Sequence, residues 1–380
     1  MNISDLRERV INHRIELHKI PEPGFCEYNT SGYIISRLEE IGYKAIKTAK
    51  TGVIAYKEGN EDECIAFRAD IDGLNISEET NAFFPSQIDG YMHACGHDGH
   101  ASILLGFAEY VFNMDLVNKG ILFIFQPAEE SPGGAEVIVT EGILNEYNVK
   151  AVFGLHIYPE LEQGQIGFRS GAMTAQSGEF DIYIKGKSGH GAMPHKANDA
   201  LIAAAQLINS YQTIISRNMN PLDSCVITIG TIKGGEVRNI IPENIIMEGT
   251  IRTFSQEVYH KIKDRMNSIN GGISEMFDVS IDIVFRDMYP PVINDRNICN
   301  MIRESSLKEQ LIEIDPMMIA EDFSYYQQEV PGVFMMLGSR NENLGYVNPL
   351  HNSKFDFDNE ILMDGIKIYD EICKMMKIYE

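Results

Sequence analysis

The segment CIAFRADID, residues 64–72, decides the expected fold because an apolar run ends there on two aspartates. Its first part, Cys64–Ala69, predicts a buried strand, with Asp70 and Asp72 directly after it. Similar runs of strand-forming residues lie at Gly52–Tyr56, Ile121–Phe125 and Ala151–His156. Helical patterns lie at Ser4–Lys19, Thr30–Ile41, Ala101–Phe112 and Ala135–Leu144. Because strands alternate with helices, we expect an α/β fold with a mixed, largely parallel sheet and helices on both faces.

The periodicity changes from Gly178 onward and predicts a second, smaller domain. Strands are expected at Phe180–Lys185, Val226–Ile232, Ile245–Phe254 and Ser280–Arg286, and helices at Asp199–Ser216 and Glu257–Met276. This βαββαβ order is typical of a compact α+β domain. The tail returns to the first pattern, with a helix at Asn297–Gln310, a strand at Val333–Leu337 and a helix at Glu360–Met376. We therefore expect one domain at residues 1–177 and 290–380, split by another at residues 178–289.

Charge and composition narrow the class of protein. The chain has 380 residues, and its formal net charge of −23 would repel nucleic acids and anionic lipid surfaces, so neither is an expected partner. No apolar run is long enough to span a bilayer, and the N-terminus lacks the apolar core of a signal peptide. The six cysteines form no CxxC pair, as expected for reduced thiols. Together these features predict a cytoplasmic protein.

Three of the ten histidines fall in one short motif, HACGHDGH, which begins at His93. Cys95 and His97 are separated by one glycine, so their side chains can converge where the backbone is irregular. Thiolate and imidazole suit zinc and other late first-row metal ions. The alternative is a helix N-terminus capped by Asp98, with the outer histidines satisfied by backbone groups. We expect His93 and His100 to support metal ligands rather than to bind a metal themselves.

Two adjacent carboxylates, Glu129 and Glu130, follow a predicted strand in the sequence FQPAEE. Adjacent like charges repel each other, so the pair is favoured near a cation. One carboxylate could bind a metal, which would admit manganese or cobalt, while the other accepts a proton as general base. The alternative is a solvated acidic turn. His156 and His351 are equally consistent with structural and ligand roles, and the residue pattern alone leaves them open.

Several motifs in order resemble the metal-dependent aminoacylase and carboxypeptidase family. The similarity is to its amidohydrolase branch, which contains hippurate hydrolases, auxin-conjugate hydrolases and N-acetyldiaminopimelate deacetylases. The motifs are LHKIPE at 17–22, RADIDG at 68–73, HACGHDGH at 93–100, FQPAEE at 125–130, GLH at 154–156, GHGAMPH at 189–195, AEDF at 320–323 and PLH at 349–351. The resemblance covers nearly the whole chain.

This resemblance implies a cofactor of two divalent metal ions per subunit: zinc, manganese, cobalt or nickel. The implied ligands are Cys95, His97, Glu130, His156 and His351, with Glu129 as the general base. In the wider family a ligand histidine stands where this chain has Arg68. Asp70 is therefore expected to support the ligands, and the Cys95 thiolate becomes a candidate bridge between the metals.

The inserted domain resembles the lid and dimerisation domain of the same family. The resemblance implies that His190 helps to hold the oxyanion, and that Asn239 and Arg252 bind the substrate carboxylate, a task that suits a guanidinium group. In relatives such a histidine reaches the site from the partner subunit. A homodimer formed through this domain is therefore implied.

The implied reaction is hydrolysis of the amide bond of a small N-acyl-L-amino acid. Residues 130–135 and 155–161 are most similar to bacterial N-acetyldiaminopimelate deacetylases, which implies deacetylation of N-acetyl-diaminopimelate in lysine biosynthesis. The C-terminal motifs are equally similar to general aminoacylases, so a hippurate hydrolase or a broad-specificity aminoacylase is the alternative. A noncatalytic binder of amino-acid derivatives is a third reading, but such a protein should lack a ligand or the base.

Overall fold

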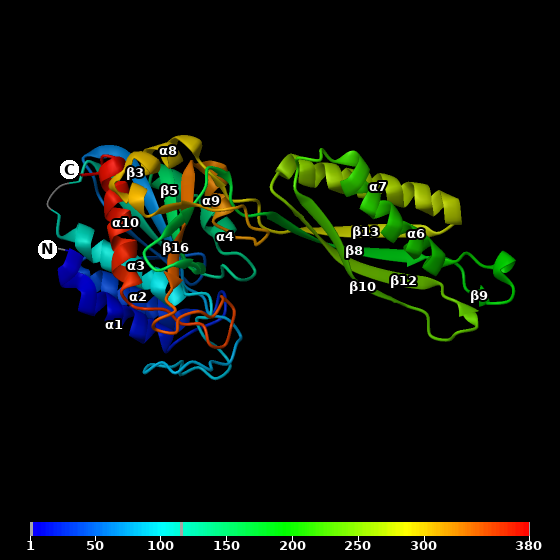
Figure 1. Cartoon of the computed structure of the whole chain (residues 1–380), viewed down its shortest axis with the longest axis horizontal. Coiled ribbons are helices and arrows are strands. Elements are labelled where there is room, and N and C mark those ends of the chain that lie inside the picture. The colour runs from blue at the N-terminus through cyan, green and yellow to red at the C-terminus, as the bar shows by residue number, and fades with distance from the viewer. Residues whose placement is uncertain (1–2, 115–116, 380) are drawn as a thin grey trace. The chain divides into compact units, whose positions relative to one another are not determined.

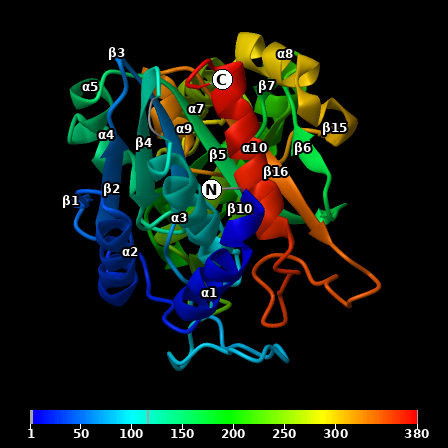
Figure 2. The same cartoon turned by 90° about the vertical axis from the view of Figure 1, so that its left-hand side faces the viewer.

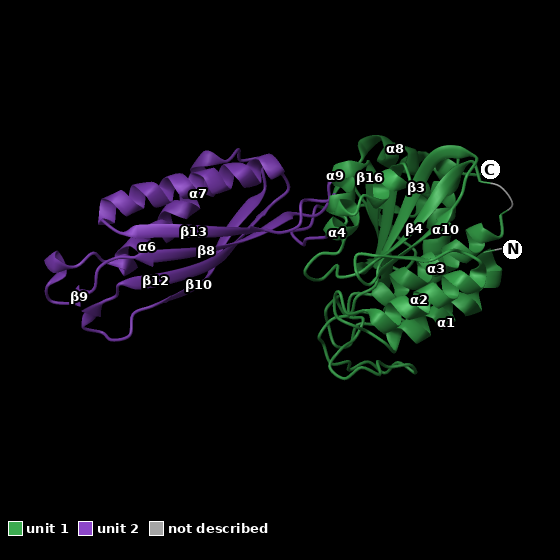
Figure 3. Ribbon diagram, turned by 180° about the vertical axis from the view of Figure 1, so that it is seen from behind, with its two compact units in different colours: residues 1–171, 293–315, 322–380 green, residues 172–292, 316–321 purple. Residues whose placement is uncertain are grey.

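The computed structural model describes residues 3–114 and 117–379. It divides into two compact units (Figure 3). Unit 1 comprises Met1–Gly171, Ile293–Asp315 and Asp322–Glu380, and unit 2 comprises Ala172–Val292 and Pro316–Glu321. The expected boundaries, after residues 177 and 289, differ by a few residues, and the sequence pattern places residues 316–321 in the larger domain. They join unit 2 because the N–H of Met317 bonds to the carbonyl of Met173, a long-range pairing that local periodicity does not reveal.

Unit 1 combines one sheet with helices. Its strands are β1 Ile46–Thr48, β2 Gly52–Lys57, β3 Glu61–Asp70, β4 Lys119–Gln126, β5 Val149–Glu162, β6 Ile166–Phe168, β15 Leu311–Glu313 and β16 Gly332–Arg340. Its helices are η1 Ile3–Leu6, α1 Arg7–His18, α2 Tyr28–Ile41, α3 His97–Phe112, α4 Ala135–Thr140, α5 Ile143–Glu146, α8 Arg296–Glu304, η4 Ser306–Glu309, α9 Ser324–Glu329 and α10 Ile361–Met375. The strand order is β1-β2-β4-β3-β5-β16-β6-β15, and β4, β3, β5 and β16 run parallel. The mixed, largely parallel sheet is therefore confirmed.

Neighbouring residues of β3 show that helices cover both faces of this sheet. The ring of Phe67 contacts Phe107 of α3. Arg68 points to the opposite face, because successive side chains of a strand alternate, and donates to Asp322 just before α9. The same aspartate accepts the backbone N–H of Ala135 at the start of α4. Figure 2 shows α1, α3 and α10 side by side on one face, and in Figure 1 α4 and α9 lie across the strands from α3 and α10.

Unit 2 has its own sheet and core. Its elements are β8 Gln176–Lys185, β9 Gly189–His190, η2 Pro194–Lys196, α6 Ala200–Thr213, the π-helical turn η3 Ile214–Asn218, β10 Cys225–Gly234, β11 Ile240–Ile241, β12 Asn244–Thr253, α7 Gln256–Phe277 and β13 Ser280–Asp287. The larger sheet has the order β10-β12-β8-β13 with antiparallel neighbours. Phe180, Ile182 and Ile184 of β8 are buried against α6 and α7. Short β7 Gly171–Ala172 and β14 Ile293–Asn294 lie at the unit boundaries along the chain.

Two predicted helices are shorter than the periodicity suggests. The pattern at 135–144 continues through Gly142, but this glycine has φ of 82° and separates α4 from α5. The pattern at 297–310 is also interrupted, because Ser305 is extended and its side chain accepts the N–H of Leu307. The apolar spacing continues across both breaks, so the spacing alone does not predict where each helix ends.

The structure also bears on the membrane and redox predictions. None of the helices within residues 3–114 and 117–379 has the length and apolar character needed to cross a bilayer. The six cysteines, all among the described residues, are free thiols. Cys95 is one of those that are buried, and its Sγ lies near a ring nitrogen of His156.

Candidate metal centre

The candidate ligands lie near the end of β3, the start of α3 and the part of β5 that is level with the end of β3. β3 ends at Asp70, and α3 begins at His97. The prediction that His156 ends a strand is wrong, because β5 pairs with β16 beyond this residue and continues to Glu162. His156 still lies level with the end of β3, since the register of the two parallel strands pairs Arg68 with Gly154.

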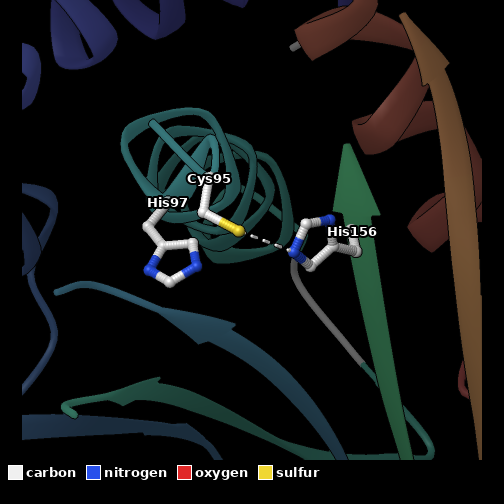
Figure 4. A group of neighbouring side chains, drawn as sticks. All are labelled: Cys95, His97 and His156. Carbon is white, nitrogen blue, oxygen red and sulfur yellow. Dashed lines mark hydrogen bonds between the residues drawn. The ribbon is translucent and has the colours of Figure 1, made fainter. Parts of the chain in front are cut away.

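Cys95, His97 and His156 form a buried group (Figure 4). The three residues each offer one ligand atom, and these atoms lie within 4.8 Å of one another. Cys95 Sγ is 3.4 Å from His156 Nε2. The turn that brings Cys95 and His97 to one side requires Gly96, whose φ of 87° is left-handed and favours glycine.

The hydrogen bonds of the two rings leave the same nitrogen of each facing this group. His97 Nδ1 lies 2.9 Å from the carbonyl oxygen of Asp72, and His156 Nδ1 lies 2.7 Å from that of Ile157. Since a carbonyl only accepts, each Nδ1 carries a hydrogen. His97 Nε2 is buried and finds no hydrogen-bond partner within the described parts of the chain. A histidine that binds a metal through one ring nitrogen typically donates a hydrogen bond from the other, as these two rings do.

The electrostatics of this group favour a cation. Burial would lower the pKa of His97, but the carboxylate of Asp70 and the bond to Asp72 raise it to about 10. Burial raises the pKa of the Cys95 thiol well above its ordinary value, and the charges of Glu130 and Glu129 raise it further. A divalent ion would reverse both effects, since it binds thiolate and neutral imidazole and releases their protons. The residues present therefore fit such an ion.

Two of the groups that share members with the first one contain the remaining predicted ligands and the predicted base. Cys95, Glu130 and His351 form one, and His97, Glu129 and Glu130 form the other. His351 Nε2 lies 3.0 Å from Glu130 Oε1, and the His351 side chain is 52% exposed. The N–H of His351 donates to the carbonyl of Ala94, which ties the C-terminal PLH motif to the residue before Cys95. Because the groups share members, the five predicted ligands and the predicted base lie in one continuous cluster.

Asp72 is a functional candidate that the sequence analysis left without a role. Its Oδ1 lies 3.1 Å from His97 Nδ1, and its Oδ2 accepts the backbone N–H of Glu130 at 3.0 Å. One carboxylate thus orients two predicted ligands. The sequence feature that could have identified Asp72 was its position two residues beyond the end of β3.

The residues expected to support the ligands are engaged in other contacts. His100 Nδ1 lies 2.6 Å from Asp70 Oδ1, and His100 Nε2 accepts the N–H of Ile157. Both ring nitrogens of His100 are therefore occupied. Asp70 also accepts from Arg68, and His93 Nδ1 lies 3.1 Å from the carbonyl oxygen of Asp72. Their supporting role stays a prediction that these contacts favour.

The alternative for the HACGHDGH motif holds in part, because α3 begins at His97 and both His93 and His100 bond to backbone groups, but its cap does not form. Asp98 lies in the first turn of α3 but does not cap it. Its Oδ2 is instead 2.8 Å from His18 Nδ1 and 3.2 Å from Arg14 Nε. Glu129 is buried, so the Glu129–Glu130 pair is not a solvated acidic turn.

The predicted substrate-binding residues lie in unit 2, and they do not form one group there. His190 and Asn239 are neighbours, because β9 pairs with β11 and the N–H of Gly191 bonds to the carbonyl of Asn239. Arg252 lies near the far end of β12, opposite Ser177. Its Nη1 is buried and without a hydrogen-bond partner among the residues that the structure describes. A substrate carboxylate within one chain could not contact both Asn239 and Arg252.

Comparison with known proteins adds independent information. The chain matches the peptidase family M20/M25/M40 over residues 66–375. It is 43% identical, over 87% of its length and 89% of the relative, to an N-acetyldiaminopimelate deacetylase of Priestia megaterium. It is 41% identical to the protein of that name from Bacillus cytotoxicus, over 96% and 97% of the two chains. A solved dinuclear metal-binding M20 peptidase from Bacillus subtilis aligns with a TM-score of 0.86 and 33% identity, over 98% of this chain and 99% of that one.

Proposed function

Because the chain belongs to the peptidase family M20/M25/M40, we propose that it is a hydrolase that removes the acetyl group from N-acetyldiaminopimelate. The observation that carries the proposal is the similarity, over most of the chain, to two deacetylases of that name. The products would be acetate and free diaminopimelate, and we propose that this reaction belongs to lysine biosynthesis. A cytoplasmic location suits this role and the free cysteines.

The cluster around Cys95 supports a site for two divalent ions. We assign Cys95, His97, Glu130, His156 and His351 as ligands, on the overlap of their groups and the orientation of the two buried rings. Thiolate, imidazole and carboxylate together suit zinc, manganese, cobalt or nickel. When bound, such ions lower the pKa of water and polarise an amide carbonyl.

Proton transfer is the task of Glu129. Its carboxylate accepts a proton from the attacking water and delivers it to the nitrogen of the departing amine. Its burial beside Glu130 keeps this proton from bulk solvent. His190 holds the oxyanion, and Arg252, whose Nη1 is buried and unpaired among the described residues, binds the substrate carboxylate.

A turnover comparison tests this assignment. We expect kcat/KM for N-acetyl-diaminopimelate to exceed that for benzoyl-glycine and simple acetyl amino acids by about tenfold or more, because the two relatives are named for that substrate. A site that binds a polar group discriminates against substrates that lack it. A chelator should abolish turnover, and added metal should restore it. Faster cleavage of benzoyl-glycine would instead identify a hippurate hydrolase. Binding without cleavage would identify a noncatalytic binder.

The positions of the unit 2 residues support a homodimer. Arg252 lies eight positions after Asn244 along β12, which is about 26 Å of extended strand. His190 and Asn239 lie beyond the Asn244 end. If all three residues contact substrate, then His190 and Asn239 serve the site of one subunit while Arg252 serves that of the other. The edge strand β10, with exposed Val226 and Ile232, offers a surface for such pairing.

Subunit mixing tests this arrangement. Glu129→Gln and His190→Ala are each expected to be inactive as homodimers. When the two are co-expressed, about a quarter of wild-type turnover should return, because half of the dimers are mixed and each mixed dimer contains one complete site. Mixing His190→Ala with Asn239→Ala provides the matched control and should restore nothing, because both residues would reach a site from the same subunit, so every site lacks one of them. Equal turnover in both mixtures would exclude a site that is shared between the two subunits.

A further inference from the structure

Glu27 is a buried carboxylate that the proposed reaction does not use. It is the residue before α2, and its carbonyl accepts the N–H of Ser31 at 2.9 Å, as at a helix start. Its side chain does not cap the helix. Instead, Oε1 accepts the N–H of Ala128 at 2.8 Å, and Oε2 accepts the hydroxyl of Thr51 at 2.5 Å. A fully buried carboxylate therefore joins α2 to the turn after β4.

Ala128 occupies a conformation that the turn must impose. Its φ is 55°, in the left-handed region that residues with a Cβ rarely adopt. The peptide groups on both sides of its Cα are held, since Glu27 accepts its N–H and its carbonyl accepts the N–H groups of Gly133 and Gly134. A Cβ on Gly134 would lie 1.9 Å from the carbonyl oxygen of Pro127, so the turn closes tightly. A hydrogen bond to a carboxylate is of the same order as the cost of one such residue.

We infer that Glu27 is a positioning residue that fixes the orientation of Glu129 by holding the N–H of Ala128. The inference rests on the proposed function, in which Glu129 transfers the proton. Glu130 has a separate anchor, because Asp72 accepts its N–H at 3.0 Å. Loss of Glu27 therefore changes the backbone that leads to Glu129 and leaves intact the hydrogen bond that Asp72 accepts from Glu130. Burial raises the pKa of Glu27 to about 6, which is consistent with a carboxylate retained for its hydrogen bonds.

Replacement of Glu27 should change kcat and leave metal content unchanged. For Glu27→Ala we expect kcat per folded site to fall about 10–100-fold, with KM and bound metal near wild type, because a displaced base slows proton transfer. Glu27→Gln should recover most of the loss, since its amide oxygen can accept the N–H of Ala128 and its amide nitrogen can donate to Thr51. If Glu27→Ala does not fold, Glu27→Asp serves in its place, because its shorter side chain cannot reach both partners.

Glu22 provides a matched control at the N-terminal end of the same helix. Its carboxylate is also largely buried, and it accepts the N–H groups of Asn29 and Thr30 at the start of α2. Glu22→Ala should lower the melting temperature and leave kcat per folded site within about twofold of wild type. An equal fall in kcat for Glu22→Ala and Glu27→Ala would overturn the inference. So would loss of metal from Glu27→Ala, or failure of Glu27→Gln to recover activity.

The role of Glu27 and the proposed function are contradicted by different results. If Glu129→Gln is inactive while Glu27→Ala and Glu27→Asp turn over as wild type, the inference about Glu27 is wrong and the proposed function stands. If Glu129→Gln is itself active, the proposed base is wrong, and a role for Glu27 in its orientation is excluded with it.

Discussion

Glu129→Gln is expected to lower kcat by roughly 10²–10⁴-fold while the protein retains its full complement of metal. Glutamine preserves the size of the side chain and one oxygen acceptor, but it does not take up a proton at neutral pH. Glu129 lies in a group with His97 and Glu130, so its location alone is compatible with a ligand or a base. Metal content distinguishes the two roles, because removal of a ligand would lower it.

The measurement combines steady-state turnover of N-acetyl-diaminopimelate with the metal-to-protein ratio after dialysis. Glu136→Gln makes the same chemical change at an exposed position at the start of α4 and should leave both quantities unchanged. Wild-type-like turnover of Glu129→Gln would remove it as the base. Loss of one metal per subunit would instead make Glu129 a ligand.

The fold was largely predictable because its main elements have local signatures. The buried run at Cys64–Ala69 predicted β3, and the alternation of such runs with helical patterns predicted the parallel centre of the sheet. The extension of β5 to Glu162 was not predictable, because it depends on pairing with β16. The place of residues 316–321 in unit 2 was not predictable either, since it depends on hydrogen bonds to residues near 173. Local periodicity carries no information about such distant partners.

The candidate site was also predictable only where its residues lie close together in the sequence. Cys95 and His97 lie in one motif, so their proximity followed from the sequence, and the left-handed Gly96 supplied the turn. His351 was left open by the residue pattern, because it joins the cluster through Glu130 and the carbonyl of Ala94. Glu27 gave no signal, since its bond to Ala128 joins residues that are 101 positions apart. The ligand and base assignments stay predictions, whereas the grouping of these residues is a property of the fold.

Arg68→Met is expected to lower the free energy of unfolding by about 3–5 kcal/mol. The Arg68 side chain is fully buried and donates to Asp70 at 2.7 Å and to Asp322 at 2.9 Å. It also donates to Gln126 at 2.8 Å. Methionine fills much of the same volume but leaves two buried carboxylates without their guanidinium. The cost is therefore the exposure of uncompensated charge to an apolar interior, and not a cavity.

The pH dependence separates this charge effect from loss of packing. Burial already raises the pKa of Asp322 to about 6, above its unfolded value, although Arg68 opposes the shift. A raised carboxyl pKa favours the folded state at low pH and loses that contribution as pH rises through the folded pKa. Removing Arg68 raises the folded pKa further. The stability deficit of Arg68→Met should therefore be larger above pH 6 than below it, whereas a packing defect would be constant with pH.

Urea unfolding of metal-free protein at several pH values measures this effect, because bound metal would add its own stabilisation. Arg7→Met is the matched control. Arg7 pairs with Glu360 in the same unit, but the two side chains are 50% and 47% exposed. An exposed pair is worth about 0–1 kcal/mol, so this variant should unfold almost as wild type. If Arg68→Met showed a similarly small loss of stability at every pH, the buried guanidinium would not be what stabilises the two carboxylates.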